Sequence, residues 1–198
     1  MNKAIRKLRE EHRSISAVVH ALEQLAHAAE DSSVRPEFEV FRAMLYYIDA
    51  FPERQHHPKE DEHLFARLRA RAPQAGPLLD DLQAEHVRSA KLIRDLEQAL
   101  LAFEQSWPNG AAAFARVVDA YARFHRAHMR KEEREVLPLA EKALKPEDWD
   151  EIEKAFAANS DPFSDPQYHT DFGKLYSRIV ELAPQPIGLG ASWKKTGA

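Results

Sequence analysis

Apolar residues recur at three- and four-residue steps along four long segments of the chain, which is the spacing that one face of an α-helix gives. The four segments span residues 5–22, 38–64, 79–100 and 114–132. Turn-forming or helix-capping residues separate them at 31–33, 72–77 and 107–110. Short connections of this kind place consecutive helices antiparallel. The pattern therefore predicts an all-α protein built on an up-down-up-down four-helix bundle, with additional C-terminal helices.

Two prolines lie inside the second segment, at Pro52 and Pro58. Proline removes a backbone donor and clashes with the carbonyl one turn back, so a kink or an irregular turn is expected there. A break into two shorter helices is the other interpretation, and the sequence leaves both open.

The chain after the bundle carries weaker helical signals. A short helix is predicted to start at Pro146, a last helix to span about 166–182, and the tail 184–198 to be extended. We expect residues 1–145 to form the bundle and residues 146–198 to form a C-terminal helical extension and tail that pack on it. Covering the bundle is the expected role of the last helix; docking a partner or forming a homodimer is the alternative.

Composition narrows the class of protein. Among 198 residues, 44% are hydrophobic, 30% are charged and glycine is scarce, which suits a helical globular domain. The net charge of −4 gives no electrostatic reason to expect nucleic acid as a partner. No apolar run reaches the roughly 20 residues of a membrane span, and the N-terminus lacks the apolar stretch of a secretory signal. We therefore expect a cytoplasmic protein without membrane contact.

Both halves of the chain carry the same polar residues. The pair Glu11-His12 recurs as Glu85-His86, at an offset of 86 − 12 = 74 residues. A His followed four residues later by a Glu occurs as His56/Glu60 and again as His128/Glu132, at an offset of 128 − 56 = 72. These residues occupy inward steps of the helical stripes, where apolar side chains are expected.

Burying a carboxylate or an unpaired imidazole is costly unless something compensates it, and a divalent cation compensates both. Residues four apart lie about 40° apart around a helix and about 6 Å along it, so each His/Glu pair projects from one face. The chain has no cysteine, which excludes thiolate ligands and iron–sulfur clusters. Nitrogen and oxygen ligands for two ions favour iron, with manganese or zinc as substitutes on purification. The predicted metal ligands are His12, His56, Glu60, His86, His128 and Glu132.

A ferritin-like di-iron site is the rival metal pattern. It would need Glu-x-x-His on two helices and a lone Glu on each of the other two. The second segment contains Glu53-x-x-His56, but the fourth contains no such motif, and the first and third offer His at the matched position. The ferritin-like interpretation is therefore rejected.

The motifs at His12, 56–65, Glu85-His86 and 128–133 together resemble the hemerythrin-like proteins, also called the HHE cation-binding domain, over about residues 1–145. The resemblance implies a non-haem di-iron centre in a four-helix bundle, held by the six residues above. Glu60 and Glu132 would be its bridging carboxylates.

The chain departs from the oxygen-carrying hemerythrins, which have a second His four residues after the one on the third helix. Ala90 occupies that position here. His125, His63 or a solvent molecule could replace the missing imidazole, and all three remain open. Those proteins also place an Asp five residues after the fourth-helix His, where this chain has Glu133.

Further polar residues lie near the motifs. His57 and Asp61 form a second pair, one residue after His56 and Glu60. On a regular helix this second pair would face about 100° away from the first, toward a neighbouring helix or solvent. Solvent exposure is the expected outcome, although a kink at Pro58 could exchange the roles of His56 and His57. Tyr121 lies two turns before His128, as a core residue or as a hydrogen-bond donor close to the metal.

Three functions fit these residues. The first is a di-iron protein that binds dioxygen or a related small ligand for sensing, storage or delivery. The second is a di-iron oxidoreductase or iron-centre repair factor acting on peroxide or nitric oxide. The third is a regulatory module that folds or binds a partner according to its iron content. A metal-binding and oxygen-binding protein is favoured over an enzyme.

Overall fold

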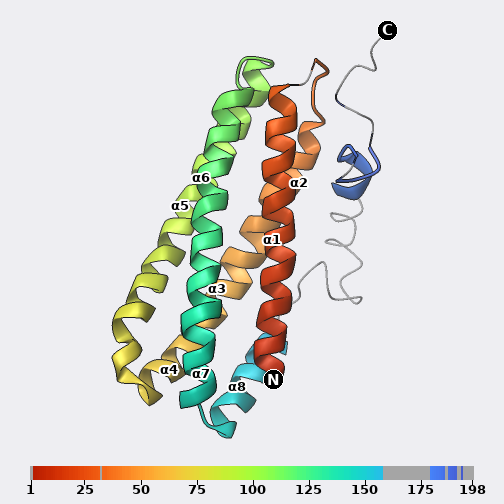
Figure 1. Cartoon of the computed structure of the whole chain (residues 1–198). Helices are drawn as coiled ribbons and strands as arrows, with labels where there is room; N and C mark the ends of the chain where they lie inside the picture. Colours follow the sequence, from red (N-terminus) through yellow and green to blue (C-terminus); the bar gives the residue numbers. More distant parts are fainter. Residues whose placement is uncertain (1, 32, 158–178, 186, 191–192, 194–198) are drawn as a thin grey trace.

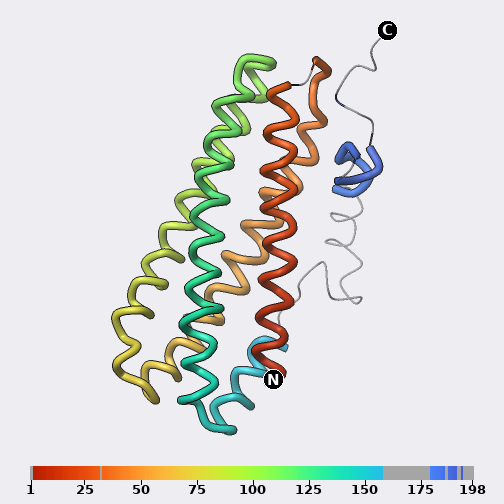
Figure 2. The backbone as a smooth tube through the Cα atoms, viewed as in Figure 1, coloured from red at the N-terminus to blue at the C-terminus, as the bar shows by residue number. Residues whose placement is uncertain are grey.

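The computed structural model describes residues 2–31, 33–157, 179–185, 187–190 and 193. Long helices run side by side along one axis and turn back at each end (Figures 1 and 2). The elements in chain order are α1 (Lys3–Glu30), α2 (Phe38–Ile48), η1 (Asp49–His56), α3 (His57–Lys59), η2 (Glu60–Phe65), α4 (Ala66–Arg71), η3 (Pro73–Ala75), α5 (Gly76–Ser106), α6 (Ala111–Lys131), η4 (Glu132–Val136), α7 (Leu137–Ala143) and α8 (Pro146–Ala157).

These elements make four antiparallel rods. The first rod is α1, the second runs from α2 to α4, the third is α5, and the fourth runs from α6 to α7. The rod α1 packs against α6 and α2, and α5 packs against the same two, so each rod has two antiparallel neighbours. The predicted all-α bundle is therefore confirmed, and its turns fall at the predicted breaks.

The second rod is continuous through both prolines but is not a regular α-helix. It becomes a π-helix over η1, which contains Pro52, and again over η2, with three α-helical residues around Pro58 between them. The fourth rod has a matching π-helical stretch at η4. A π-helix is hydrogen-bonded between residues i and i+5 instead of i and i+4, and such segments are frequent at functional sites. The expected irregular turn is thus a widening of the helix rather than a break.

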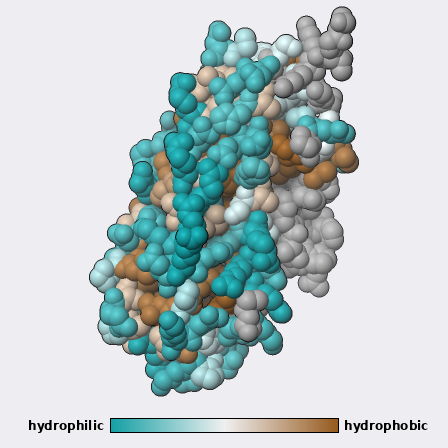
Figure 3. Space-filling model, in the orientation of Figure 1, coloured by the Kyte–Doolittle hydropathy of each residue, from teal (hydrophilic) through white to brown (hydrophobic). Residues whose placement is uncertain are grey.

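Two apolar clusters fill the interior at different heights. The upper cluster includes Leu22, Phe41, Phe103 and Phe114. The lower cluster lies near the N-terminus of α1 and includes Leu8, Leu64, Leu82 and Val136. Amphipathic helices supply both, and the face of the molecule seen in Figure 3 is mostly hydrophilic. The height between the two clusters is where the polar residues of interest lie.

The C-terminal part contributes to both clusters. Helix α8 buries Trp149, Ile152 and Phe156 in the lower cluster. Further along, Ile179 and Trp193 are buried in the upper cluster. Most of the predicted last helix, 166–182, lies outside the described residues. In the described part of the chain, no helix has the length and hydrophobicity to cross a membrane.

Candidate metal centre

The six predicted ligand residues meet in the middle of the bundle, between the two apolar clusters. Helix α1 carries His12 and α5 carries His86, while the π-helical junctions of the other two rods carry the His/Glu pairs. All six side chains are buried, and none of the six residues is more than 6% exposed. Their convergence follows from the antiparallel rods, because residues at matching heights on all four face one axis.

The nitrogen and oxygen donors fall into two adjacent groups. One group contains His12, His56 and Glu60, and the other contains His57, Glu60, His86 and His128; within each, the potential ligand atoms lie within 4.8 Å of one another. Two imidazole nitrogens of the second group, His86 Nε2 and His128 Nε2, are 3.1 Å apart. Two ligand atoms that each lie about 2.1 Å from one ion at a right angle would be separated by about 3.0 Å.

Two glutamates connect the groups. Glu60 Oε1 lies 3.4 Å from His56 Nε2 and 3.6 Å from His12 Nε2, while its Oε2 lies 3.7 Å from His86 Nε2. Glu132 Oε1 lies 3.1 Å from His128 Nε2, while its Oε2 lies 3.4 Å from His12 Nε2. Each carboxylate thus presents one oxygen to each group, as a carboxylate that bridges two ions does.

His57 contradicts the expectation from regular helix geometry. The residue is 3% exposed rather than solvated, and it belongs to the group of His86 and His128. Its ring stacks on His86 with centroids 4.2 Å apart. The expectation was wrong because η1 and η2 flank this turn, and a π-turn holds one residue more than an α-turn and shifts the direction of the residues after it. Adjacent residues His56 and His57 therefore face different groups.

Carboxylates surround the imidazoles on their outer side. The Nδ1 atoms of four rings hydrogen-bond a carboxylate at 2.8–3.1 Å, and His57 Nδ1 lies 3.5 Å from Glu53. The pairs are His12 with Glu133, His56 with Glu11, His57 with Glu53, His86 with Asp61 and His128 with Glu85. Such partners fix the tautomer and orientation of a metal-binding imidazole and raise its basicity.

The buried carboxylates of the centre favour positive charge on the imidazoles around them. Burial would lower the pKa of His12, but the hydrogen bond to Glu133 and the nearby Glu60 and Glu132 outweigh it and raise the pKa to about 10. The same competition raises the pKa of His86 to about 9 and that of His128 to about 10. His57 behaves differently: burial, followed by the charge of His86, lowers its pKa well below the usual value. Protons on three imidazoles thus supply charge that a metal ion would supply instead.

Several buried ligand-type atoms at the centre make no normal hydrogen bond. They are His12 Nε2, Glu60 Oε2 and Glu132 Oε1. Leaving buried polar atoms unpaired is costly, and each of these three lies within 3.1–3.7 Å of a ligand-type atom of another residue of the centre. Nitrogen and oxygen donors without sulfur suit iron, manganese or zinc. The residues present therefore fit a pair of such ions.

Comparison with known families agrees with this geometry. The hemerythrin HHE cation-binding domain matches residues 3–140, which is most of the chain and includes every residue of the two groups. The chain belongs to this family. A search of curated proteins found no significant match. Family membership and the buried His/Glu clusters together indicate a metal site in this HHE domain.

The other sequence candidates lie in different places. Asp61 reaches the centre only through His86, whose Nδ1 it hydrogen-bonds at 3.1 Å. His63 is half-buried and joins neither group, and His125 is buried but also joins neither. Tyr121 is buried, and its ring stacks on His125 with centroids 5.7 Å apart. In the structure, the imidazole that accompanies His86 and His128 is thus His57, rather than His125 or His63.

Sequence reasoning missed most of the outer carboxylates. The repeated Glu-His pairs contained a signal for Glu11 and Glu85, because each precedes a His of the centre but hydrogen-bonds the His of the neighbouring rod. Glu133 was considered only as a departure from the family pattern. No periodic signal distinguishes Glu53, which lies in the irregular segment η1.

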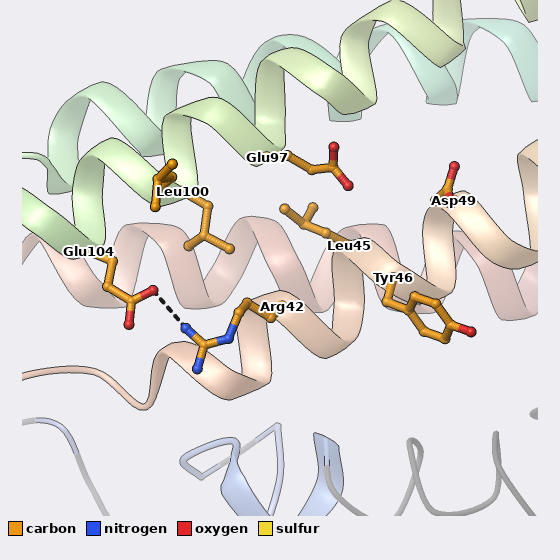
Figure 4. Close-up of a pocket in the computed structure, with 8 residues that line it drawn as sticks. Arg42, Leu45, Tyr46, Asp49, Glu97, Leu100 and Glu104 are labelled. Carbon is orange, nitrogen blue, oxygen red and sulfur yellow. Dashed lines mark hydrogen bonds and ion pairs between the residues drawn. The ribbon is translucent and has the colours of Figure 1, made fainter.

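Two surface hollows differ in their relation to the centre. One, of about 540 Å³, lies between α1 and α6 and reaches His12 and Glu133. The other, of about 290 Å³, lies between α2 and α5, where Arg42 and Glu104 form an ion pair of 2.6 Å (Figure 4). No residue of the two donor groups lines the second hollow. Only the first is placed to connect the centre with solvent.

Proposed function

We propose that this HHE-domain protein holds a non-haem di-iron centre that binds dioxygen or a related small ligand for sensing, storage or delivery. The observation that supports it most is the pair of glutamates, each with one oxygen toward each imidazole group. One ion would take His12 and His56, the other would take His57, His86 and His128, and Glu60 and Glu132 would be shared. When bound, a pair of ferrous ions supplies the electrons that dioxygen needs to bind in reduced form.

The surroundings of the centre suit a small ligand. Apolar clusters close the bundle above and below it, so bulk water is excluded along the axis. Exclusion of water protects a reactive centre from side reactions. The hollow between α1 and α6 gives a lateral approach to His12. The ligand enters, in this proposal, from the side of the bundle.

Exposure of the iron-loaded, reduced protein to air tests the proposed function. We expect new absorption bands in the near-ultraviolet and visible range, because imidazole- and carboxylate-bound iron gives charge-transfer transitions when it is oxidised. Bands that disappear when oxygen is removed would support reversible binding. Reduced, iron-loaded protein with an unchanged spectrum in air would contradict the proposal.

The proposed division of the imidazoles between two ions can be tested at His57. Replacing it in the variant His57→Ala should reduce the iron content from about two ions per chain toward about one, because one group keeps only two of its three imidazoles. His63→Ala is the matched control, since that ring is half-buried in the same rod and joins neither group. Iron and protein are measured in the same sample. Equal iron contents in both variants would remove His57 from the proposed ligands.

An oxidoreductase or iron-centre repair factor acting on peroxide or nitric oxide is the second candidate. It is favoured by Glu53, because burial raises the pKa of this carboxyl to about 7, so that it can take up and release a proton near the centre around neutral pH. Reduction of hydrogen peroxide to two water molecules consumes two protons and two electrons, and a ferrous pair could supply the electrons if an added reductant restores it after each cycle. Turnover of hydrogen peroxide by the iron-loaded protein in the presence of such a reductant, absent in Glu132→Ala, would favour this candidate over ligand carriage.

A further inference from the structure

One layer of the bundle lies a single turn from the candidate ligands, on the side of the upper apolar cluster. Its residues lie three positions from a candidate ligand on each rod, on the side of the upper cluster. On the first and third rods they follow His12 and His86, and on the second and fourth rods they precede His56 and His128. The four residues are Ile15, Ser89, Glu53 and His125. Because the rods alternate in direction, all four lie at about the same height. Three of the four are polar, although the layer is enclosed.

Half of this layer is satisfied by its own hydrogen bonds. Ser89 Oγ donates to Glu53 Oε1 at 2.5 Å, and His57 Nδ1 lies 3.5 Å from the same carboxylate oxygen. These residues belong to the second and third rods. The hydroxyl of Ser89 and the carboxyl of Glu53 are therefore partners of each other, whereas His57 Nδ1 is near Glu53 without making a hydrogen bond.

His125 on the fourth rod is not satisfied. The residue is 1% exposed, and among the described residues neither of its ring nitrogens has a hydrogen-bond partner. Its ring lies between Tyr121 and His128, nearly parallel to both, with centroids 5.7 Å and 6.4 Å away. Each of the five imidazoles of the centre has a carboxylate beside Nδ1, and His125 has none.

His125 is suited to donate a hydrogen bond to a ligand. Its ring is buried, and among the described residues no carboxylate hydrogen-bonds either ring nitrogen. A neutral imidazole carries one N–H donor and one acceptor nitrogen. An imidazole that is buried without partners destabilises the fold, and an apolar residue of similar size would avoid that cost.

The position of the glutamates indicates which side of the centre is open to a ligand. Glu60 and Glu132 follow His56 and His128 by four residues, so their backbone lies one turn toward the lower cluster. Their carboxylates approach the imidazoles from that side. On the opposite side, none of the four residues of the layer described above belongs to either donor group.

We propose that His125 donates a hydrogen bond to the small exogenous ligand bound at the centre, and that this layer is the ligand-binding face. The inference rests on the proposed di-iron function and adds to it the ligand's chemistry. The ligand would be a molecule of two or three heavy atoms with a hydrogen-bond acceptor, such as azide, dioxygen or peroxide. Ile15, which is buried in the upper apolar cluster, adds an apolar side chain to this face.

Azide is the probe for this proposal, and His125→Leu is the variant. We expect iron-loaded wild type and His125→Leu to have the same iron content, because His125 belongs to neither donor group. The dissociation constant of azide, read from its charge-transfer band, should rise about fivefold to tenfold in the variant, which corresponds to one lost hydrogen bond. The metal-free variant should also melt at a higher temperature than metal-free wild type, because an unpaired buried imidazole has been removed.

Two further variants sharpen the result. His125→Asn keeps an N–H donor and should restore part of the azide affinity, and it also serves if His125→Leu does not fold. His63→Leu is the matched control and should leave azide affinity unchanged. If both His125 variants load iron and bind azide as tightly as wild type, this inference is overturned and the proposed di-iron function is not. Loss of iron in His125→Leu would make His125 a metal ligand and overturn it too, whereas wild type that takes up no iron would overturn both this inference and the proposed function.

Discussion

Replacing Glu60 with glutamine is expected to abolish occupancy of both metal positions at once. Among the described residues, Glu60 belongs to both donor groups, and its two oxygens face different imidazoles. Glutamine keeps the shape of the side chain but removes the charge and one of the two metal-binding oxygens. Loss of a residue that only supports a ligand typically costs 10–100-fold in metal affinity, so we expect more than about 100-fold for Glu60→Gln. Competition with a coloured chelator measures the change.

Glu62→Gln is the control for this experiment. Glu62 lies in the same π-helical segment, is exposed and joins neither group, so the substitution should leave metal affinity within a factor of about two of wild type. Both variants should retain the helical circular dichroism of the native protein. If Glu60→Gln bound metal as tightly as Glu62→Gln, Glu60 would not be a shared ligand.

Metal binding is expected to raise the melting temperature strongly, and to do so more at high pH than at low pH. At a free metal concentration about 100 times the dissociation constant, binding to the folded state adds about 2.7 kcal/mol, which is about 5–10 °C for a chain of this length. Thermal unfolding followed by circular dichroism, with and without metal, measures the shift. Equal melting temperatures would contradict the metal site.

The pH dependence follows from the imidazoles of the centre. The pKa values of His12, His86 and His128 in the folded, metal-free protein, about 10, 9 and 10, lie above the value of about 6.5 in the unfolded chain. Their contribution to the stability of metal-free protein is therefore complete below pH 6.5 and is lost as the pH rises through about 9 to 10. Metal requires unprotonated imidazole, so its binding strengthens over the same range. The shift in melting temperature should be larger at about pH 8.5 than at about pH 6.5, and the reverse order would contradict this assignment.

The sequence was sufficient for the bundle because each rod repeats its apolar residues at helical spacing over many turns. The breaks were equally clear, since residues such as those at 72–77 and 107–110 cannot continue a helix well. The division of the chain into residues 1–145 and 146–198 stays a prediction. It depends on how separable α8 is from the bundle, and α8 shares the lower apolar cluster with Leu8 on α1.

The position of the six candidate residues was predictable for a different reason. A polar residue at an inward step is conspicuous, and the same set occurs in each half of the chain. The place of His57 was not predictable, because periodicity assumes one number of residues per turn and η1 and η2 break that assumption. The carboxylates beside each Nδ1 were also hidden, since the contact of Glu11 with His56 joins residues 45 apart on different rods.

The wide turn that places His56 and His57 in different groups has a consequence for how the centre fills. In the proposed di-iron centre, these two neighbouring residues on one short stretch of backbone would bind different metal ions. An ion that immobilises one of these rings also immobilises the backbone that carries the other, so the second ion arrives at a site whose ordering has already been achieved. Uptake of the two ions is therefore expected to be cooperative, with little singly loaded protein during a titration.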